Sequence, residues 1–471
     1  MLPITLTEVA AVTGGRLHRA GGDEVVTAVE FDTRTLAAGG LFVALPGERV
    51  DGHDYAGAAL AAGAVGVLAG REVDAPAVIA PPVPDRATDG YLAATDPDGH
   101  GAAVLAALAR LAGASVAALP GCTVVGVTGS SGKTSTKDLL AAVLAPLGET
   151  VAPPGSFNNE LGLPWTALRA GAGTRHLVLE FSARGAGHIA ALAAAVPPRI
   201  GVVLNVGSAH LGEFGSPAAI AQAKGELVEA LPADGVAVLN ADDPAVAAMG
   251  IRTAARVVLT GRHPNAHVRA EDVHVDAGRA RFTLVAPGGS APVALRLVGE
   301  HHVANALSAA AVALELGGTP EGVAHALTLA EPASRWRMEL TERPDGVTVV
   351  NDAYNANPES MRAALSALAS IGAGRRTWAV LGRIGELGEG SDEAHAQVAA
   401  VARELGVDEI VAVGAPEYGA AREVPDVDTA LALLHAELRP GDAVLVKASR
   451  AAGLERLAAA LVDPSRLEGA R

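Results

Sequence analysis

The segment TVVGVTGSSGKTSTKDLLAAVL, residues 123–144, constrains the fold most strongly. A β-branched apolar run passes through a turn of small residues into a helical pattern that opens at Lys133. Small residues let backbone N–H groups point at phosphate oxygens, and the helix N-terminus adds a partial positive charge. In such a loop Lys133 holds terminal phosphates and the Thr134 hydroxyl a Mg²⁺ ion. Because Val127 replaces the first glycine of the strict pattern, we predict a variant phosphate loop, T-G-x-x-G-K-T, rather than a Gly-rich turn without a ligand.

The composition limits what surrounds this loop. A chain of 471 residues is too long for one hydrophobic core, and domains of about 100–200 residues indicate about three of them. The formal net charge of −16 and the pI near 5.3 argue against nucleic acid or an anionic membrane as partner. Only 3% of the residues are aromatic, so we expect cores built mainly of Ala, Val and Leu. The single cysteine, Cys122, excludes an intrachain disulfide framework.

Neither a signal peptide nor a membrane span is indicated. The opening segment MLPITLTEVAAVTGG lacks the basic residues that begin a signal peptide. The Ala/Leu-rich stretch 101–119 is interrupted by Arg110 and several glycines, which argues against a span. We therefore expect a cytoplasmic protein without stable membrane insertion. Separately, we expect it to be a monomer.

Strand-like runs and helical stretches alternate in three blocks. Residues 1–118 contain GGLFVALPG, AVGVLAG and APAVIAPP and end in an Ala-rich helix, which indicates a small N-terminal α/β domain. Residues 119–330 alternate runs such as HLVLEF and RIGVVLNV with helices, the pattern of a mostly parallel sheet. Residues 331–471 repeat the alternation with VTVVND, TWAVLG, EIVAVG and AVLVK, and indicate a C-terminal Rossmann-like domain. The predicted fold class is α/β with three domains.

Polar residues follow several of the central strand-like runs. Glu180 comes directly after HLVL, Asn205 closes RIGVVLN, and the next loop carries His210. Because phosphate binds at the C-terminal edge of such a sheet, these side chains are expected near the phosphate loop. A lone loop histidine is more often a surface residue than a ligand, but alignment with Glu180 and Thr134 at one edge favours a metal or substrate site.

Lys224 lies within IAQAKGELVEAL, a predicted helix. One interpretation is a solvated lysine paired with Glu226 or Glu229. The other is a metal site, because a neutral lysine amine can add CO₂ and the resulting carbamate is an oxygen ligand of the kind that Mg²⁺ prefers. The residues alone leave both open.

Several segments occur in the order and spacing of the Mur ligases: TGSSGKTST, LEFSARGAGHI, NVGSAHLGEFGSPAAIAQAKGE, EHHVANALSAAAVAL, VVNDAYNANPESM and GDAVLVKASR. The chain resembles this family over nearly its whole length, most closely the MurF branch, which joins D-alanyl-D-alanine to UDP-N-acetylmuramoyl-tripeptide in peptidoglycan synthesis. The segments SAHLGEFGS with AKGE, and NDAYNANP, separate this branch from relatives that add a single amino acid. The early segment DTRTLAAGGLFVALPGERVDGHDY resembles the uridine-nucleotide-binding start of that branch.

The resemblance implies ATP and two Mg²⁺ ions as cofactors. The residues matching Glu180 and His210 hold Mg²⁺ together with Thr134, and the lysine matching Lys224 is carbamylated. Catalysis would be carried by Lys133, Glu180, His210 and Lys224. ATP would contact the phosphate loop and three later side chains, with Arg337 preferred to Arg335: Thr128, Gly129, Ser130, Ser131, Gly132, Lys133, Thr134, Asn305, Arg337 and Asp352.

The implied partners are UDP-N-acetylmuramoyl-tripeptide and D-alanyl-D-alanine. The residues expected to contact them are Thr33, Arg34, Asn158, Asn159, Asn355, Asn357, Lys447, Ser449 and Arg450. Without the resemblance, simpler roles are favoured for three of the later residues. Asn305 would cap a turn, Asp352 would cap a helix, and Lys447 would be an exposed charge at a strand end.

Some positions depart from the family pattern. In LGRIGELGEG, Arg383 and Ile384 stand where MurF sequences commonly carry Asp and Met, which puts a metal or nucleotide role for that loop in doubt. His302 replaces a frequent polar partner beside Asn305, and residues 81–100 fit the pattern poorly.

Other functions compete with this interpretation. A MurE-type ligase or a folylpolyglutamate synthase would share ATP and the carbamate but add a different amine, and the DNPR motif usual in MurE-type sequences is missing. A P-loop kinase or GTPase would need a base-reading motif such as NKxD, which is also missing. A non-catalytic binding protein would not need Lys133, Thr134, Glu180, His210 and Lys224 together.

Overall fold

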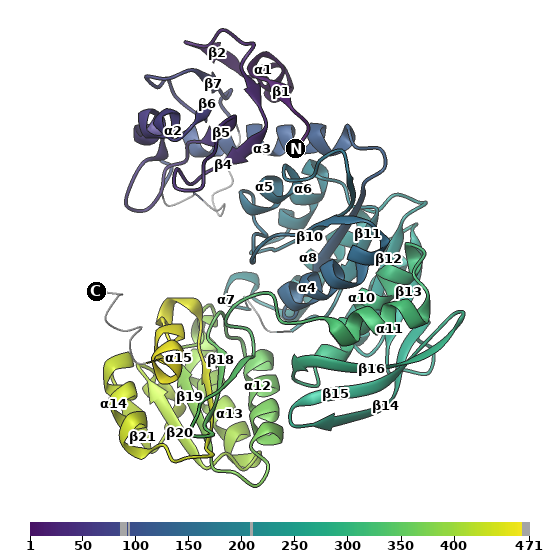
Figure 1. Cartoon of the computed structure of the whole chain (residues 1–471), viewed down its shortest axis with the longest axis vertical. Helices are drawn as coiled ribbons and strands as arrows, with labels where there is room; N and C mark the ends of the chain where they lie inside the picture. Colours follow the sequence, from purple (N-terminus) through teal and green to yellow (C-terminus); the bar gives the residue numbers. More distant parts are fainter. Residues whose placement is uncertain (85–91, 93–94, 208–210, 464–471) are drawn as a thin grey trace.

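The computed structural model describes residues 1–84, 92, 95–207 and 211–463. Among these, three larger sheets come from three successive stretches of the sequence and lie along an open arc (Figure 1). The predicted α/β class, with a mostly parallel central sheet, is confirmed. Each sheet lies inside one of the three predicted ranges, and the boundaries at residues 118 and 330 themselves stay predictions.

The N-terminal sheet has the strand order β2-β7-β6-β5-β4 and is parallel except at β2. Its strands are β2 (Arg16–His18), β4 (Ala28–Glu30), β5 (Gly40–Val43), β6 (Ala64–Ala69) and β7 (Ala77–Ile79), and β1 (Ile4–Thr5) pairs separately with β3 (Val25–Val26). Its helices are α1 (Leu6–Thr13), η1 (Gly52–Tyr55), α2 (Ala56–Ala61) and α3 (His100–Ala117). By length and composition α3 could cross a membrane. It instead packs one face against α1 and α5, as a core helix does.

The central sheet has the order β16-β15-β14-β13-β12-β11-β8-β10-β9, with parallel pairing from β9 to β14. The parallel strands are β8 (Thr123–Thr128), β9 (Glu149–Val151), β10 (Thr174–Glu180), β11 (Ile200–Val203), β12 (Val236–Asn240) and β13 (Arg256–Gly261). The helices are α4 (Lys133–Leu144), η2 (Ala145–Leu147), α5 (Gly162–Ala167), α6 (His188–Ala195), α7 (Leu211–Phe214), α8 (Pro217–Glu229), α9 (Pro244–Ala247), η3 (Ala248–Arg252), α10 (His302–Glu315) and α11 (Pro320–Leu329).

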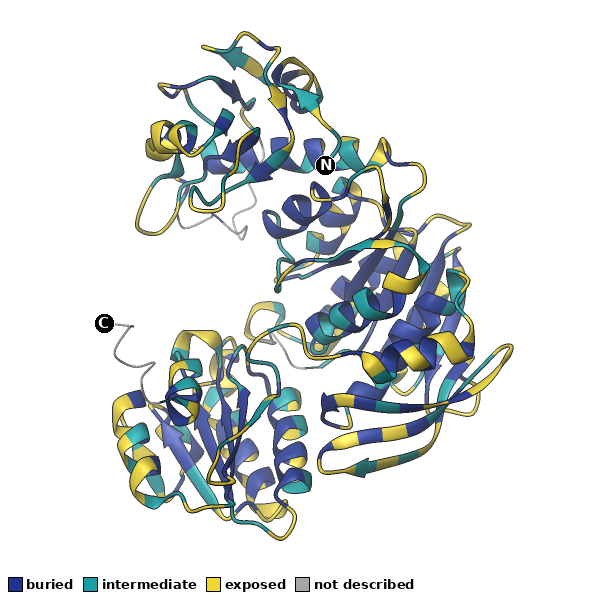
Figure 2. Cartoon of the chain, viewed as in Figure 1, coloured by how far each residue is buried: buried dark blue, intermediate teal, exposed yellow. Residues whose placement is uncertain are grey.

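Three long strands extend this sheet in a way that the sequence analysis does not predict. They are β14 (Val268–Asp276), β15 (Arg279–Ala286) and β16 (Gly289–Val298), and they pair as an antiparallel meander. Their buried and exposed residues alternate, so one face packs on the core while charged side chains occupy the other (Figure 2). Because charged residues alternate with apolar ones, these three strands lack the continuous apolar runs from which the parallel strands were predicted.

The C-terminal sheet has the order β17-β18-β22-β19-β20-β21 and is parallel except for β17. Its strands are β17 (Glu339–Glu342), β18 (Thr348–Asp352), β19 (Thr377–Gly382), β20 (Glu409–Val413), β21 (Arg422–Val424) and β22 (Ala443–Lys447). Its helices are α12 (Pro358–Ile371), η4 (Gly388–Gly390), α13 (Ser391–Glu404), η5 (Pro416–Tyr418), α14 (Val427–Glu437), η6 (Arg450–Ala452) and α15 (Glu455–Val462). The four predicted strands β18, β19, β20 and β22 are all present, and the missed strands lie at the two edges.

The cores consist mainly of Ala, Val and Leu, as the composition predicts. In the central sheet, α4, α10 and α11 cover one face, while α5, α6 and α8 cover the other. Figure 2 shows the resulting buried layer of strands between partly exposed helices. The parallel strands therefore end at one edge of a sheet whose two faces are both covered, and that edge is where side chains can meet a ligand.

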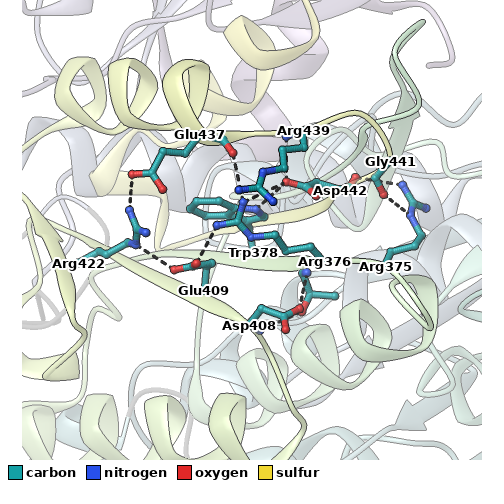
Figure 3. Close-up of polar contacts among 11 residues, drawn as sticks. Arg375, Arg376, Trp378, Asp408, Glu409, Arg422, Glu437, Arg439, Gly441 and Asp442 are labelled. Atoms are coloured by element: carbon teal, nitrogen blue, oxygen red, sulfur yellow. Dashed lines mark hydrogen bonds and ion pairs between the residues drawn. The ribbon is translucent and has the colours of Figure 1, made fainter.

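An ion-pair network closes the opposite end of the C-terminal sheet (Figure 3). The guanidinium groups of Arg376 and Arg422 both lie over the indole ring of Trp378, with their central carbons 4.4 and 5.5 Å from its centre. Its Nε1 donates a 3.0 Å hydrogen bond to the Asp442 carboxylate, which also accepts one from the Arg439 backbone. Both Trp378 and Asp442 are buried, so this carboxylate satisfies donors that water does not reach.

Replacing Asp442 by alanine is expected to destabilise the protein by about 2–3 kcal/mol, because it leaves the buried Trp378 N–H without an acceptor. Urea unfolding of the purified variants measures this. Asp442→Asn keeps an acceptor oxygen and should lower the free energy of unfolding by less than Asp442→Ala does. Glu423→Ala removes an exposed side chain from β21 and should change it by less than about 0.5 kcal/mol. Equal stability of the alanine variant and the parent would contradict this role.

Candidate active site

The predicted phosphate loop joins β8 to α4, and α4 begins at Lys133 as expected. Gly132 has a φ of +82°, and a Cβ at this position would lie 2.7 Å from Asn305 Oδ1. Only glycine fits without displacing Asn305. The loop therefore meets α10 in direct contact, and Asn305 lies inside that helix, so its alternative role as a turn cap is wrong.

Asn205, just after β11, holds the loop in shape. Its side-chain oxygen accepts a 2.9 Å hydrogen bond from the Ser131 N–H, and its backbone oxygen accepts one of 3.1 Å from the Ser130 N–H. Thr128 is fully buried and donates to the backbone oxygen of Phe181, so its side chain supports the fold beneath the loop. The loop is thus shaped before any ligand arrives.

A polar cluster lies beside the first turn of α4. Thr134 Oγ1 is 3.2 Å from Glu180 Oε2 and 3.3 Å from Ser156 Oγ, and Asn158 Nδ2 donates to both Ser156 and Glu180. Glu180 is fully buried, and its Oε1 has no hydrogen-bond partner among the described residues. An ionised carboxylate in this state requires a positive partner, and a hard cation fits the surrounding oxygens.

Lys133 points back over the loop, where its Nζ donates a 2.5 Å hydrogen bond to the Gly129 carbonyl. Burial lowers the pKa of Lys133 below its ordinary value, and the nearby Glu180 charge opposes that shift. The lysine therefore contacts its own loop in this structure, and its contact with phosphates stays a prediction.

Lys224 is buried within α8, so its interpretation as a solvated lysine is wrong. Glu226 accepts hydrogen bonds from the N–H groups of Gly187 and Ala190, and Glu229 pairs with Arg252. Neither carboxylate is therefore the partner that the simpler interpretation requires. Burial, assisted by the charge of Lys133, holds the pKa of Lys224 well below its usual range.

His210, the remaining predicted metal ligand, lies outside the described residues. Among the residues described, no three His, Cys, Asp or Glu side chains gather as a metal cluster. Thr134 and Glu180 lie side by side, and all four predicted metal ligands, these two with His210 and Lys224, stay predictions.

The C-terminal part contributes a second charged group. Lys447, at the end of β22, is buried, and its Nζ lies 2.5 Å from Asp352 and donates to the Asn355 carbonyl. Lys447 is therefore not an exposed strand-end charge, and Asp352 ends β18 rather than capping a helix. Asn357 caps α12 and reaches the Ser130 carbonyl at 3.4 Å, which joins the two parts of the chain.

One cavity of about 600 Å³ lies between the central and C-terminal sheets. Residues 130–134 of the phosphate loop, with Ser156 and Asn158 beside Glu180, border it on the central side, while Arg337, Asp352 and Lys447 border it from the C-terminal side. Asn158, Asn159, Asn305, Asn355 and Asn357 also line it. Most of the predicted nucleotide residues thus line one cavity, whereas Thr128, Gly129, Glu180 and Lys224 are not among its lining residues.

Other predicted substrate residues lie away from this cavity. Ser449 accepts a hydrogen bond from Gly385, and Arg450 pairs with Glu455. Thr33 and Arg34 belong to the N-terminal part, where Arg34 is largely exposed and pairs with Asp32. Contacts from these four residues to substrate stay predictions. Arg383, whose position departs from the family pattern, pairs with Glu417 at the surface.

Sequence reasoning missed several cavity residues, including Ser156, His301 and Tyr354. Burial lowers the pKa of His301 to about 4, so it lines the cavity as a neutral ring at neutral pH. Sequence reasoning also missed Lys137, whose buried Nζ donates hydrogen bonds to the Pro153 carbonyl and to Ser334. A signal was available, because only four of the 36 basic residues are lysines, and all four lie at or beside this site.

Comparison with known proteins identifies the family. Residues 25–115 match the Mur ligase family catalytic domain, residues 127–313 the Mur ligase middle domain, and residues 336–450 the Mur ligase glutamate ligase domain. The UDP-N-acetylmuramoyl-tripeptide–D-alanyl-D-alanine ligase of Mycobacterium tuberculosis (strain H37Rv) is 54% identical over 98% of both chains. That of Escherichia coli (strain K12) is 35% identical over 98% of this chain and 99% of its own.

Solved structures agree over the whole chain. MurF from Acinetobacter baumannii superposes with a TM-score of 0.84 at 29% identity, covering 98% of this chain and 99% of its own. The MurF ligase from Thermotoga maritima in complex with ADP gives a TM-score of 0.77 at 29% identity, covering 94% and 99%. The chain therefore belongs to the Mur ligase family, and within it to the MurF branch.

Proposed function

We propose that this protein joins D-alanyl-D-alanine to UDP-N-acetylmuramoyl-tripeptide, with ATP converted to ADP and phosphate, in the cytoplasm and as a monomer. The observation that carries this is that the phosphate loop faces Arg337 and the Asp352–Lys447 pair across one shared cavity. The full-length similarity to ligases of that name, and to a MurF structure in complex with ADP, supports the substrates. The shared family makes a P-loop kinase the weaker alternative.

The chemistry requires an activated carboxylate, because an oxygen of a free carboxylate leaves too poorly for an amine to displace it. Transfer of the γ-phosphoryl group to the tripeptide carboxylate gives an acyl-phosphate and ADP. Lys133 would neutralise charge on the phosphates during transfer, and Arg337 would reach the same phosphates from the C-terminal side. The amine of D-alanyl-D-alanine then attacks the acyl carbon, and phosphate leaves with the bonding electrons. The donors that already face the phosphates also stabilise the tetrahedral oxyanion.

The residues present fit Mg²⁺, because Glu180 Oε1 is buried without a partner among the described residues and the Thr134 hydroxyl lies beside Oε2 of the same carboxylate. We propose that Thr134, Glu180, His210 and a carbamate on Lys224 hold two ions. When bound, they would supply positive charge between the phosphates and the acceptor carboxylate. The lowered pKa of Lys224 supports the carbamate, since only the neutral amine reacts with CO₂.

The substrates divide among the three parts of the chain. We assign the UDP-sugar to the N-terminal part through Thr33 and Arg34, and its peptide to Asn158 and Asn159. D-alanyl-D-alanine would enter beside Asn355, Asn357 and Lys447, with Ser449 and Arg450 on its outer side. Closure of the C-terminal part over the cavity would exclude water, which otherwise hydrolyses the acyl-phosphate.

Acceptor choice tests this proposal. With ATP and UDP-N-acetylmuramoyl-tripeptide, ADP release is expected with D-alanyl-D-alanine and to stay at background with meso-diaminopimelate, lysine or glutamate. Product mass identifies the new amide. Ligation of a single amino acid to UDP-N-acetylmuramoyl-dipeptide would favour a MurE-type activity, and ligation of glutamate a folylpolyglutamate synthase-type activity.

A further inference from the structure

Arg337 reaches the cavity from an irregular segment between α11 and β17. Its guanidinium lines the cavity, and its Nε is buried without a hydrogen-bond partner among the described residues. A long flexible side chain of this kind usually requires ionic partners to stay in one orientation. Among the residues that the structure describes, no carboxylate pairs with Arg337, and the group that contacts its guanidinium is the ring of Tyr354.

The backbone on both sides of Arg337 adopts the left-handed region. Trp336 has a φ of +60° and Met338 a φ of +51°, which is uncommon for such large residues. Hydrogen bonds maintain both conformations: the Tyr354 N–H donates to the Trp336 carbonyl at 3.2 Å, and the Met338 N–H donates to Asp352 at 3.1 Å. Strained backbone kept in this way is typical of functional positions. Here it turns Arg337 and Trp336 toward Tyr354.

The side chains then form a stack of four. The Arg337 guanidinium lies 4.2 Å from the centre of the Tyr354 ring, and Tyr354 and Trp336 stack at 6.4 Å with 28° between their planes. The central guanidinium carbon of Arg450 lies 4.4 Å from the centre of the Trp336 ring, and Nη1 of the same guanidinium pairs with Glu455. We call Arg337, Tyr354, Trp336 and Arg450 the cation–aromatic stack. Arg337 and Tyr354 line the cavity, whereas Trp336 and Arg450 do not.

We propose that Trp336 and Arg450 are positioning residues which, through Tyr354, hold Arg337 toward the terminal phosphate and so favour nucleoside triphosphate over diphosphate. The Tyr354 face attracts the guanidinium without accepting a hydrogen bond from its terminal N–H groups, which therefore remain available to a ligand. A carboxylate partner would occupy those donors. The inference rests on the proposed role of Arg337 at the terminal phosphate, and it adds the residues that orient it.

Affinity for two nucleotides separates positioning from general stabilisation. Titration calorimetry would measure the dissociation constants of ADP and of the non-hydrolysable triphosphate AMP-PNP, both with Mg²⁺. Arg337→Gln is expected to weaken AMP-PNP binding about tenfold or more and ADP binding by less than about twofold. Trp336→Ala should weaken AMP-PNP about three- to fivefold with little effect on ADP, because only the orientation of the guanidinium is lost.

Matched variants make the result decisive. Trp336→Phe keeps a stacking ring and should bind AMP-PNP as the parent does, and Arg450→Gln, at a half-exposed position, should weaken it about twofold. Adding Trp336→Ala to Arg337→Gln should cause no further loss of affinity for AMP-PNP. If Trp336→Ala fails to fold, Arg450→Gln and its double variant with Arg337→Gln decide the question.

Two outcomes would overturn the inference, and they differ. Equal weakening of both nucleotides by Trp336→Ala, or a further loss in the double variant, would reduce the stack to a structural element and leave the role of Arg337 intact. Equal weakening of both nucleotides by Arg337→Gln would remove Arg337 from the terminal phosphate, and the proposed phosphate contact would fail together with the stack.

Discussion

Lys133→Ala is expected to lower the rate of ADP formation by about 100- to 1000-fold while leaving the fold intact. Lys133 is the only lysine of the loop, and its ammonium already lies over the loop carbonyl of Gly129. Removing one preorganised charge from a water-excluded site costs about this much in transition-state stabilisation. Acceptor-dependent ADP release at saturating substrates, measured beside thermal unfolding, gives the rate and confirms folding.

Arg175→Ala is the matched control for Lys133→Ala. It removes an exposed positive charge from β10, on the same sheet but outside the cavity, and should leave the rate unchanged. Near-parental turnover of a folded Lys133→Ala variant would remove the loop from the mechanism.

Lys224→Ala is expected to lose activity about 100-fold, and formate or acetate should restore part of it. A carbamate needs a neutral amine and a cation that binds the anionic product, and burial of Lys224 supplies the first condition. A small carboxylate can occupy the space left by the shortened side chain and offer the same oxygens. Turnover with rising formate, at ionic strength kept constant with chloride, measures the rescue.

The Lys133→Ala variant serves as the control for this rescue, because formate cannot replace an ammonium and should leave it inactive. Native mass spectrometry under CO₂ should detect the adduct on the parent and not on Lys224→Ala. A fully active alanine variant, together with an unmodified parent, would exclude the carbamate.

Local sequence was sufficient to predict the strand, turn and helix of the phosphate loop. Val125 and Val127 are fully buried on β8, and α4 begins at Lys133, because a β-branched apolar run, small turn residues and a helix start each have one favoured backbone state. The same reasoning placed Glu180 and Asn205 at the sheet edge that carries the loop. The strands β14, β15 and β16 escaped it, because their alternating charged residues weaken the apolar signal although the pleat exposes only one face.

The sequence by itself determined the α/β class, the phosphate loop and the edge of the central sheet at which Glu180 lies, since these depend on residues close together in the chain. Only the tertiary structure decided that Lys224 is buried, that Lys447 pairs with Asp352 across 95 positions, and that Arg337 lies over the ring of Tyr354. Burial and charge pairing depend on which distant segments pack together. No local pattern encodes that packing, because the residues that exclude water from a buried side chain lie far away from it in the sequence.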